Sequence, residues 1–208
     1  MRFKKTFCAI LSLIIICPWI LAVGALNPAE PHSANAMWLE PSLIELDPST
    51  ISVGYKFNVT AWANSSLQTK GWQFWLVYAN AYINATRTGY TAGSKSEFFK
   101  DIATLPVKPA FIVNYNATHN RLDYGEAWIM GDMRGPGYGS LCWVEFTVVA
   151  LPLGGAMAEI PLDIKWAYDQ FDPPKTYLLY GDGAFRPLNV YNSPVSYTHL
   201  RAHETGRN

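Results

Sequence analysis

Apolar and polar positions alternate along most of the chain between Met37 and Ser193, with a period of two residues. Such alternation is typical of strands with one buried face, and no stretch carries a 3.6-residue apolar stripe long enough to predict a helix. Clusters of Asn, Gly, Pro and Ser separate the alternating segments and supply turns. The pattern predicts eight strands, namely Leu39–Leu46, Tyr55–Ala63, Gly71–Tyr78, Phe111–Tyr115, Arg121–Ile129, Ser140–Ala150, Glu159–Trp166 and Thr176–Tyr180.

Eight short strands separated by such turn segments predict an all-β fold, an antiparallel β-sandwich with jelly-roll topology. The longest interruption, Thr86–Pro109, is polar and then proline-rich, and it leaves room for a short helix around Ser96–Ile102. Met37–Ser193 contains 157 residues, which is long enough for one domain with its own core and short for two.

The amino-terminal residues carry the pattern of an export signal. A basic segment precedes 19 uncharged residues from Phe7 to Ala25, and small and polar residues follow. Residues 1–36 are therefore expected to be a signal peptide and leader, cleaved after Ala25 or after Ala36. The alternative is an uncleaved membrane anchor, because this run approaches the roughly 20 residues that a spanning helix needs. Either way, an extracellular or cell-surface location is expected.

The carboxyl-terminal residues have a different character. Val195–Thr205 reads VSYTHLRAHET and resembles a translated sequencing-library adapter, so residues 194–208 are expected to be foreign to the natural protein. The domain at residues 37–193 would then lack its closing strand, and its first strand would keep an unpaired edge. The adapter-like residues are not expected to pack as a substitute. A membrane anchor beyond the missing end is the second way in which the chain would reach a membrane.

Charge and cysteine content narrow the classes of function. Residues 37–193 contain 11 Lys and Arg and 14 Asp and Glu, a net charge of −3, so no basic surface is available to hold nucleic acid. Cys142 is the single cysteine of this segment. An intramolecular disulfide is therefore excluded there, and a buried, unreactive thiol is expected.

Side chains that carry catalysis are sparse in the same segment. Its single histidine, His119, falls in a predicted turn without a nucleophile, and a zinc site would need more His and Cys ligands. Glycoside hydrolysis needs a pair of carboxylates, but those available are expected to be solvated strand and loop residues. They are Asp123, Glu126, Asp132 and Glu145. We therefore expect no enzyme activity, no cofactor and no metal site.

Three segments resemble a cohesin domain. Ile51–Val59 and Gly71–Tyr78 are similar to the opening of that family, in which a "vGd.F.V.V" strand leads to a "gwqF.L.Y" strand. Gly137–Phe146 is similar to the family's "G.G.L..i.F" strand. Their order and spacing cover most of Met37–Tyr180 and indicate the superfamily of cohesins and related carbohydrate-binding sandwiches. One departure is Ala79-Asn80-Ala81, where cohesins commonly place Asp/Asn-Pro.

The resemblance implies a non-catalytic extracellular module that attaches to a dockerin-like or other surface protein. The alternative is a carbohydrate-binding module of a polysaccharide-degrading or surface protein, with a polysaccharide as its partner. Membership of the fold does not decide between them, because one fold supports many functions.

Two strands supply a candidate binding face for either partner. Trp72 and alternate residues of Gly71–Tyr78 are expected in the core, as are Cys142 and alternate residues of Ser140–Ala150. The resemblance implies that the two strands are neighbours, so their outward side chains would form one face. These are Gln73, Trp75, Val77, Trp143, Glu145 and Thr147. Flat aromatic rings beside hydrogen-bonding groups suit a sugar ring or a protein partner.

Four Asn-x-Ser/Thr sequons are candidate N-glycosylation sites and accord with an exported protein. They begin at Asn58, Asn64, Asn84 and Asn116. Turns rich in Asn and Thr generate sequons by composition alone, so these four give only weak support for a glycosylated surface.

Overall fold

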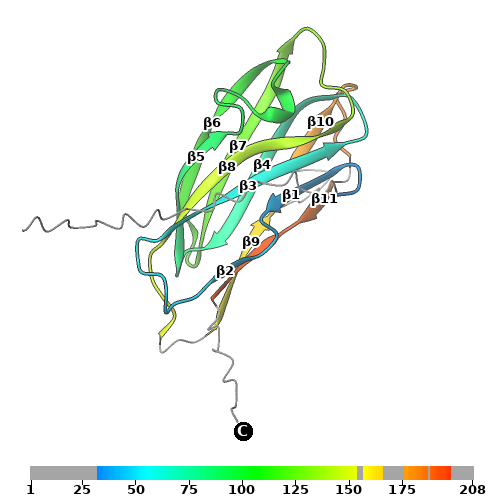
Figure 1. Ribbon diagram of the computed structural model, residues 1–208. Coiled ribbons are helices and arrows are strands. Elements are labelled where there is room, and N and C mark those ends of the chain that lie inside the picture. The colour runs from blue at the N-terminus through cyan, green and yellow to red at the C-terminus, as the bar shows by residue number, and fades with distance from the viewer. Residues whose placement is uncertain (1–31, 154–156, 166–175, 187, 198–208) are drawn as a thin grey trace, which may run out of the picture.

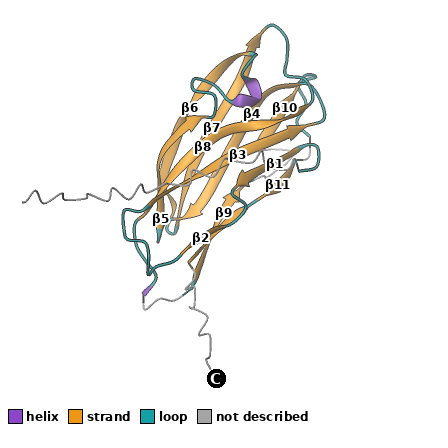
Figure 2. Cartoon of the chain, in the orientation of Figure 1, coloured by secondary structure: helices purple, strands orange, loops and turns teal. Residues whose placement is uncertain are grey.

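Two β-sheets pack face to face in the computed structural model of the chain (Figure 1). The structure describes residues 32–153, 157–165, 176–186 and 188–197, which contain 12 strands and the short 3-10 helix η1 (Glu97–Phe99). Figure 2 shows that strands make up most of the described chain. The predicted all-β sandwich is confirmed.

Each sheet combines strands that are distant in the sequence. Sheet A has the order β11 (Asn189–Tyr191), β1 (Ala36–Glu40), β3 (Lys56–Ser65), β8 (Gly137–Val148) and β5 (Ile83–Tyr90). Sheet B has the order β2 (Ile44–Leu46), β12 (Ser193–Tyr197), β9 (Ala158–Ile164), β4 (Thr69–Ala79), β7 (His119–Met130) and β6 (Ala103–Asn116), and β10 (Tyr177–Tyr180) also pairs with β4. β1 pairs with β11, and β2 with β12, in parallel, whereas the other pairs are antiparallel.

The core lies between the sheets and is built from alternate residues of each strand. The predicted inward faces of β4 and β8 are confirmed, because their alternate apolar side chains are almost fully buried. They are Trp72, Phe74, Leu76 and Tyr78 on β4, and Cys142, Val144, Phe146 and Val148 on β8. The Phe146 ring packs edge-on against Tyr78 across the sandwich, with 5.1 Å between the ring centroids.

The predicted first strand is divided into two. β1 ends at Glu40 and belongs to sheet A, whereas β2 begins at Ile44 and belongs to sheet B. Pro41 follows β1, and because proline has no amide hydrogen to donate, it suits a point where the chain leaves one sheet for the other. Leu39 and Ile44 both face the core although they are five residues apart, so the alternation changes phase between the two strands.

The predicted long interruption contains structure that the pattern did not indicate. β5 occupies its first part, and β6 begins at Ala103, not at Phe111. Both are edge strands, where the two-residue alternation is weak because little of either strand is buried. Pro106 and Pro109 are tolerated in β6 because an edge strand has unpaired amide positions. The short helix is confirmed as η1, capped by Ser96.

Two expectations about the carboxyl-terminal end are wrong, namely that the first strand keeps an unpaired edge and that the adapter-like residues do not pack, whereas the incompleteness of the domain at residues 37–193 stays a prediction. Residues 189–191 pair with β1, and Ser193–Tyr197 pairs with both β9 and β2. Val195 and Tyr197 are fully buried, whereas Pro194 and Ser196 point away from the core. Two apolar side chains at alternate positions therefore suffice for this short strand to pack. The adapter-like origin of residues 194–208 stays a prediction.

The predicted signal or anchor at residues 1–36 falls largely outside the described residues, since the description begins at His32. Among the described residues, no helix has the length and apolar character needed to cross a membrane.

Candidate functional site

The six residues predicted to share one binding face are divided between opposite sides of the molecule. β4 lies in sheet B, whereas β8 lies in sheet A between β3 and β5. Gln73, Trp75 and Val77 therefore point to the outer side of sheet B, which we call face B. Val77 is only 4% exposed, so its expected part in a binding surface is wrong. Trp143, Glu145 and Thr147 lie on the outer side of sheet A, which we call face A. The prediction of one continuous face is wrong, because strand periodicity identifies which residues share a face and not which sheet contains the strand.

Face B carries an arginine held between two aromatic rings. The Arg121 guanidinium carbon is 3.7 Å from the Trp75 ring centroid and 4.9 Å from the Tyr115 ring centroid. Arg121 Nη2 donates a hydrogen bond to Asp123 Oδ2 at 2.9 Å, and Arg121 Nε lies 2.7 Å from Asp123 Oδ1 as an ion pair. A planar guanidinium favours this combination of ring stacking and carboxylate binding. The result is a rigid patch, defined by Trp75, Arg121, Tyr115 and Asp123.

A hollow of about 350 Å³ lies beside this patch on face B. Its walls include Gln73, Lys108 and Tyr177, and Trp75 forms part of its rim. The floor includes Gly125, where a Cβ atom would come within 2.9 Å of the Trp72 carbonyl oxygen. A side chain at this position would strain the sheet and also fill the hollow, so glycine keeps the hollow open.

Face A carries Trp143, whose indole covers Gly89 of the edge strand β5. Three atoms of the indole lie 2.7–2.8 Å from the position that a Cβ on Gly89 would occupy. Beside it, Glu145 accepts hydrogen bonds from Lys56 Nζ at 2.9 Å and from Thr86 Oγ1 at 3.0 Å. The hydrogen bond from Lys56 lowers the pKa of this carboxyl. Thr147 Oγ1 lies 3.1 Å from Thr86 Oγ1 and completes the polar cluster.

Further aromatic side chains on face A come from strands that the sequence did not connect. The Trp38 and Trp62 rings are stacked with centroids 6.2 Å apart, and Tyr138 lies 6.5 Å beyond Trp62. His32 packs against Trp38 at 4.9 Å and against Tyr191 at 4.2 Å. Trp38 is fully buried, whereas 42% of Tyr138 is exposed. The sequence analysis did not identify these rings, because only the pairing of β1, β3, β8 and β11 brings them together.

The carboxylates considered for glycoside hydrolysis do not converge. Asp123 binds Arg121 on face B, Glu145 lies on face A, and Asp132 lies in the loop after β7. Glu126 is 1% exposed, so the expectation that it is solvated is wrong, and it accepts hydrogen bonds within the sandwich. Within the described ranges, no group of three His, Cys, Asp or Glu side chains is placed to hold a metal ion.

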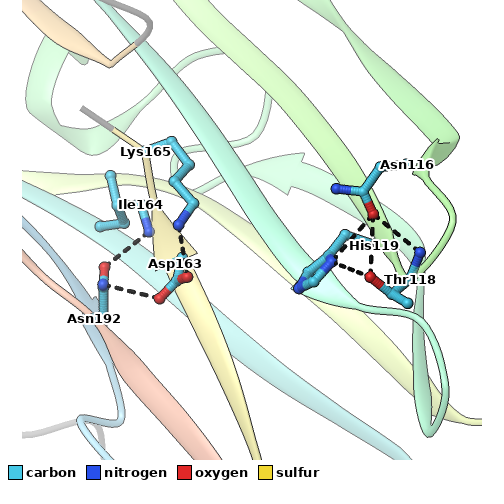
Figure 3. Close-up of polar contacts among 7 residues, drawn as sticks. All are labelled: Asn116, Thr118, His119, Asp163, Ile164, Lys165 and Asn192. Atoms are coloured by element: carbon cyan, nitrogen blue, oxygen red, sulfur yellow. Dashed lines mark hydrogen bonds and ion pairs between the residues drawn. The ribbon is translucent and has the colours of Figure 1, made fainter. Parts of the chain in front are cut away.

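His119 is the first residue of β7 and adjoins the two-residue turn after β6, so its predicted position within the turn is wrong by one residue. Its Nδ1 atom is 2.8 Å from Thr118 Oγ1 and 3.2 Å from Asn116 Oδ1 (Figure 3). Asn116 Oδ1 also accepts a hydrogen bond from the Thr118 amide at 3.0 Å. These contacts organise the turn itself and bring no nucleophile to the histidine.

The asparagine side chains of the four sequons differ in their exposure and in their hydrogen bonds. Asn58 and Asn116 are exposed. In contrast, Asn64 Nδ2 donates a hydrogen bond to the His32 carbonyl at 2.7 Å, and Asn84 Oδ1 accepts one from the Tyr78 hydroxyl at 3.0 Å. A glycan is therefore accommodated more readily at the two exposed positions, and glycosylation of all four stays a prediction.

Cys142 is fully buried, as predicted. Desolvation, reinforced by the charge of Glu126, raises the pKa of its thiol well above the usual value. The thiolate, which is the reactive form, is thereby disfavoured.

Comparison with known proteins supports the architecture. No family model and no curated protein sequence matches the chain. Three solved structures match with a TM-score of 0.51. A non-cellulosomal cohesin from the archaeon Archaeoglobus fulgidus is 12% identical, covering 81% of this chain and 94% of that one. A cohesin in a type I cohesin–dockerin complex from Clostridium thermocellum is 9% identical, covering 82% and 99%. The type II cohesin A11 from Bacteroides cellulosolvens is 14% identical, covering 77% and 98%. The two-sheet sandwich described above is therefore a cohesin-like fold.

Proposed function

We propose that the chain is a non-catalytic, exported binding module that attaches to a dockerin-like surface protein through face B. The cohesin-like fold supports a protein-binding role, and the Clostridium thermocellum neighbour was solved in complex with a dockerin. The observation that carries the choice of face is the Arg121 side chain, held between Trp75 and Tyr115 and paired with Asp123.

Tryptophan, tyrosine and arginine are the residue types that most often dominate the binding energy of protein interfaces. Here they are already ordered against one another, so a partner would lose little side-chain entropy in ordering them. The pairing of Arg121 with Asp123 also matters, since it leaves no unpaired charge to desolvate when the patch is covered. The adjacent hollow, floored by Gly125, offers room for a side chain of the partner.

The test measures binding of purified dockerins by isothermal titration calorimetry. Probes are the dockerin of the Clostridium thermocellum complex and dockerin-like segments encoded in the genome that encodes this chain. We expect Trp75→Ala and Arg121→Ala each to weaken binding about tenfold or more, as for central interface anchors. Trp143→Ala, the matched control on face A, should leave affinity unchanged.

Two results would count against the proposal. Binding that Trp75→Ala and Arg121→Ala leave intact would show that another surface docks the partner. Failure of every dockerin probe to bind the folded wild-type chain would reject the partner class.

A further inference from the structure

The position of Trp143 is unusual for a large apolar side chain on an outer face. Its indole lies over the backbone of Gly89, with three ring atoms 2.7–2.8 Å from the position of an added Cβ. Any other residue at position 89 would displace the ring. The side chain is half-buried, so the indole is supported from below by β5 and remains partly open to solvent. An aromatic ring that covers a glycine of an edge strand stabilises that strand. This structural role explains the position of Trp143, but it does not explain the other aromatic rings on face A.

Two further aromatic rings extend this surface. Thr60 is opposite Trp143 in the register of β3 and β8, and Trp62 follows two residues later, roughly 7 Å along the strand. The Tyr138 ring lies 6.5 Å from that of Trp62. Trp143, Trp62 and Tyr138 are all at least partly exposed, and the three define what we call the aromatic strip. The strip contains more than one ring, so it suits a chain molecule better than a single small ligand.

Both neutral and charged polar groups border the strip. Thr60 and Asn64 point outward beside the rings, opposite Trp143 and Tyr138 respectively. Glu40 on β1 lies opposite Thr60, and Tyr138 lines a hollow together with Glu97 and Arg134. The strip therefore offers apolar ring surface with hydrogen-bonding groups along its edges.

We propose that face A binds a polysaccharide of pyranose units, with Trp143 as the main stacking platform and Trp62 and Tyr138 extending the contact. A pyranose ring has an apolar surface of C–H groups and a rim of hydroxyls. Stacking on an indole buries the first, and hydroxyl and amide side chains such as Thr60 and Asn64 bind the second. This function is additional to protein docking, because the two faces lie on opposite sides of the sandwich and can be occupied together.

The experiment measures binding of the full chain to sugars of defined composition. Probes are insoluble cellulose in a depletion assay, and the β-1,4-linked hexasaccharides of glucose, xylose and mannose in titration calorimetry. We expect at least one probe to bind, and Trp143→Ala to weaken that binding about tenfold or more. Trp75→Ala provides the matched control, since it removes the same side chain from face B and should leave sugar affinity unchanged.

A second variant separates loss of binding from loss of folding. Trp143→Ala leaves Gly89 uncovered, so its near-ultraviolet circular dichroism is compared with wild type. Tyr138→Ala, at an exposed position, should keep the fold and still weaken binding several-fold. Absence of binding to all four probes, or equal weakening by Trp75→Ala, would overturn the proposal. So would self-association in sedimentation that Trp143→Ala abolishes, since face A would then be an interface between copies. Dockerin affinity is measured on the same variants, so the two proposals can fail separately.

Discussion

At the scale of single residues, the buried carboxylate of Glu126 joins four parts of the fold. Its Oε2 atom accepts hydrogen bonds from Trp72 Nε1 at 3.2 Å and from the Ser96 amide at 3.1 Å, and also from the Ser96 hydroxyl. Its Oε1 atom accepts one from Thr104. A carboxylate is tolerated in a protein interior only with such compensation. Glu126 on β7 thereby connects β4, the cap of η1 and the start of β6.

Trp72 therefore contributes both apolar burial and a hydrogen bond to the core. We expect Trp72→Ala to reduce the free energy of unfolding by roughly 3 to 5 kcal/mol, as for other buried aromatic residues, and to leave Glu126 with one donor fewer. Trp75→Ala and Trp143→Ala should change it much less. Urea denaturation followed by circular dichroism measures all three. Comparable losses in the three variants would mean that the outer faces are as well packed as the core.

The sequence predicted which of these side chains point inward but not what they contact. Alternation placed Trp72 in the core and Trp75 outside, and both are confirmed. The stack of Arg121 on Trp75 was not predictable, because it depends on the register between β4 and β7, which places Trp75 opposite Asp123. Gly89 and Gly125 carry no sequence signal of their own, since their role appears only when a neighbouring strand supplies the contact.

At the scale of elements, a tyrosine on β5 connects sheet A to β6 and β7 of sheet B. Tyr90 on β5 of sheet A donates its hydroxyl hydrogen to the Gly125 carbonyl at 2.6 Å, and the Val107 carbonyl lies 3.0 Å away. Both acceptors belong to sheet B. The Tyr124 ring is 4.7 Å from the Tyr90 ring, and burial raises the pKa of both hydroxyls above the usual range.

This arrangement predicts loss of stability in alkali. In the unfolded chain these tyrosines release their protons near pH 10, whereas in the folded chain they retain them to higher pH. Their contribution to stability is thus complete below about pH 10 and is lost as the pH rises toward the folded pKa. Tyr90→Phe should reduce the steepness of that loss, measured as the free energy of unfolding between pH 8 and pH 11. Tyr138→Phe is the exposed control, and an equal effect there would contradict a role for burial.

Strands were predictable from sequence in proportion to how much of one face they bury. β4 and β8, with one face in the core, were found almost to their ends, whereas the edge strand β5 was missed. Strand pairing was harder to predict. β8 pairs with β3 and β5, but the residue pattern of a strand does not indicate which strands lie beside it. The error in assigning the binding face has this origin.

At the scale of the whole molecule, the beginning and the end of the described chain close the sandwich together. β11 pairs with β1 in sheet A, and β12 pairs with β2 in sheet B. Asn192 lies between the two closing strands, accepts a hydrogen bond from the Ile164 amide at 2.8 Å and donates one to Asp163 at 3.1 Å (Figure 3). The sequence predicted that a closing strand is needed near the first strand, but not that residues 193–197 provide it.

Deletion of β12 tests how much this strand stabilises the fold. Val195 and Tyr197 are fully buried beside Ile44, Leu46 and Ile160. Deleting residues 194–208 should therefore reduce the free energy of unfolding by several kcal/mol, because it empties two core positions and leaves β2 and β9 with unpaired edges. Deleting only residues 198–208 is the matched control and should change little. Urea denaturation of both variants measures the difference.

We expect the stability that β12 contributes to depend on its alternation of inward apolar and outward polar positions, and not on the identity of each residue. Replacing the inward Val195 and Tyr197 by serine should destabilise about as much as the deletion, because polar side chains would then be buried without partners. Replacing the outward Pro194 and Ser196 by threonine should have little effect. Such a result would show that the alternation of residues 193–197 is enough for them to complete the core. If both double variants unfold like the wild-type chain, residues 193–197 do not hold the sandwich closed in solution.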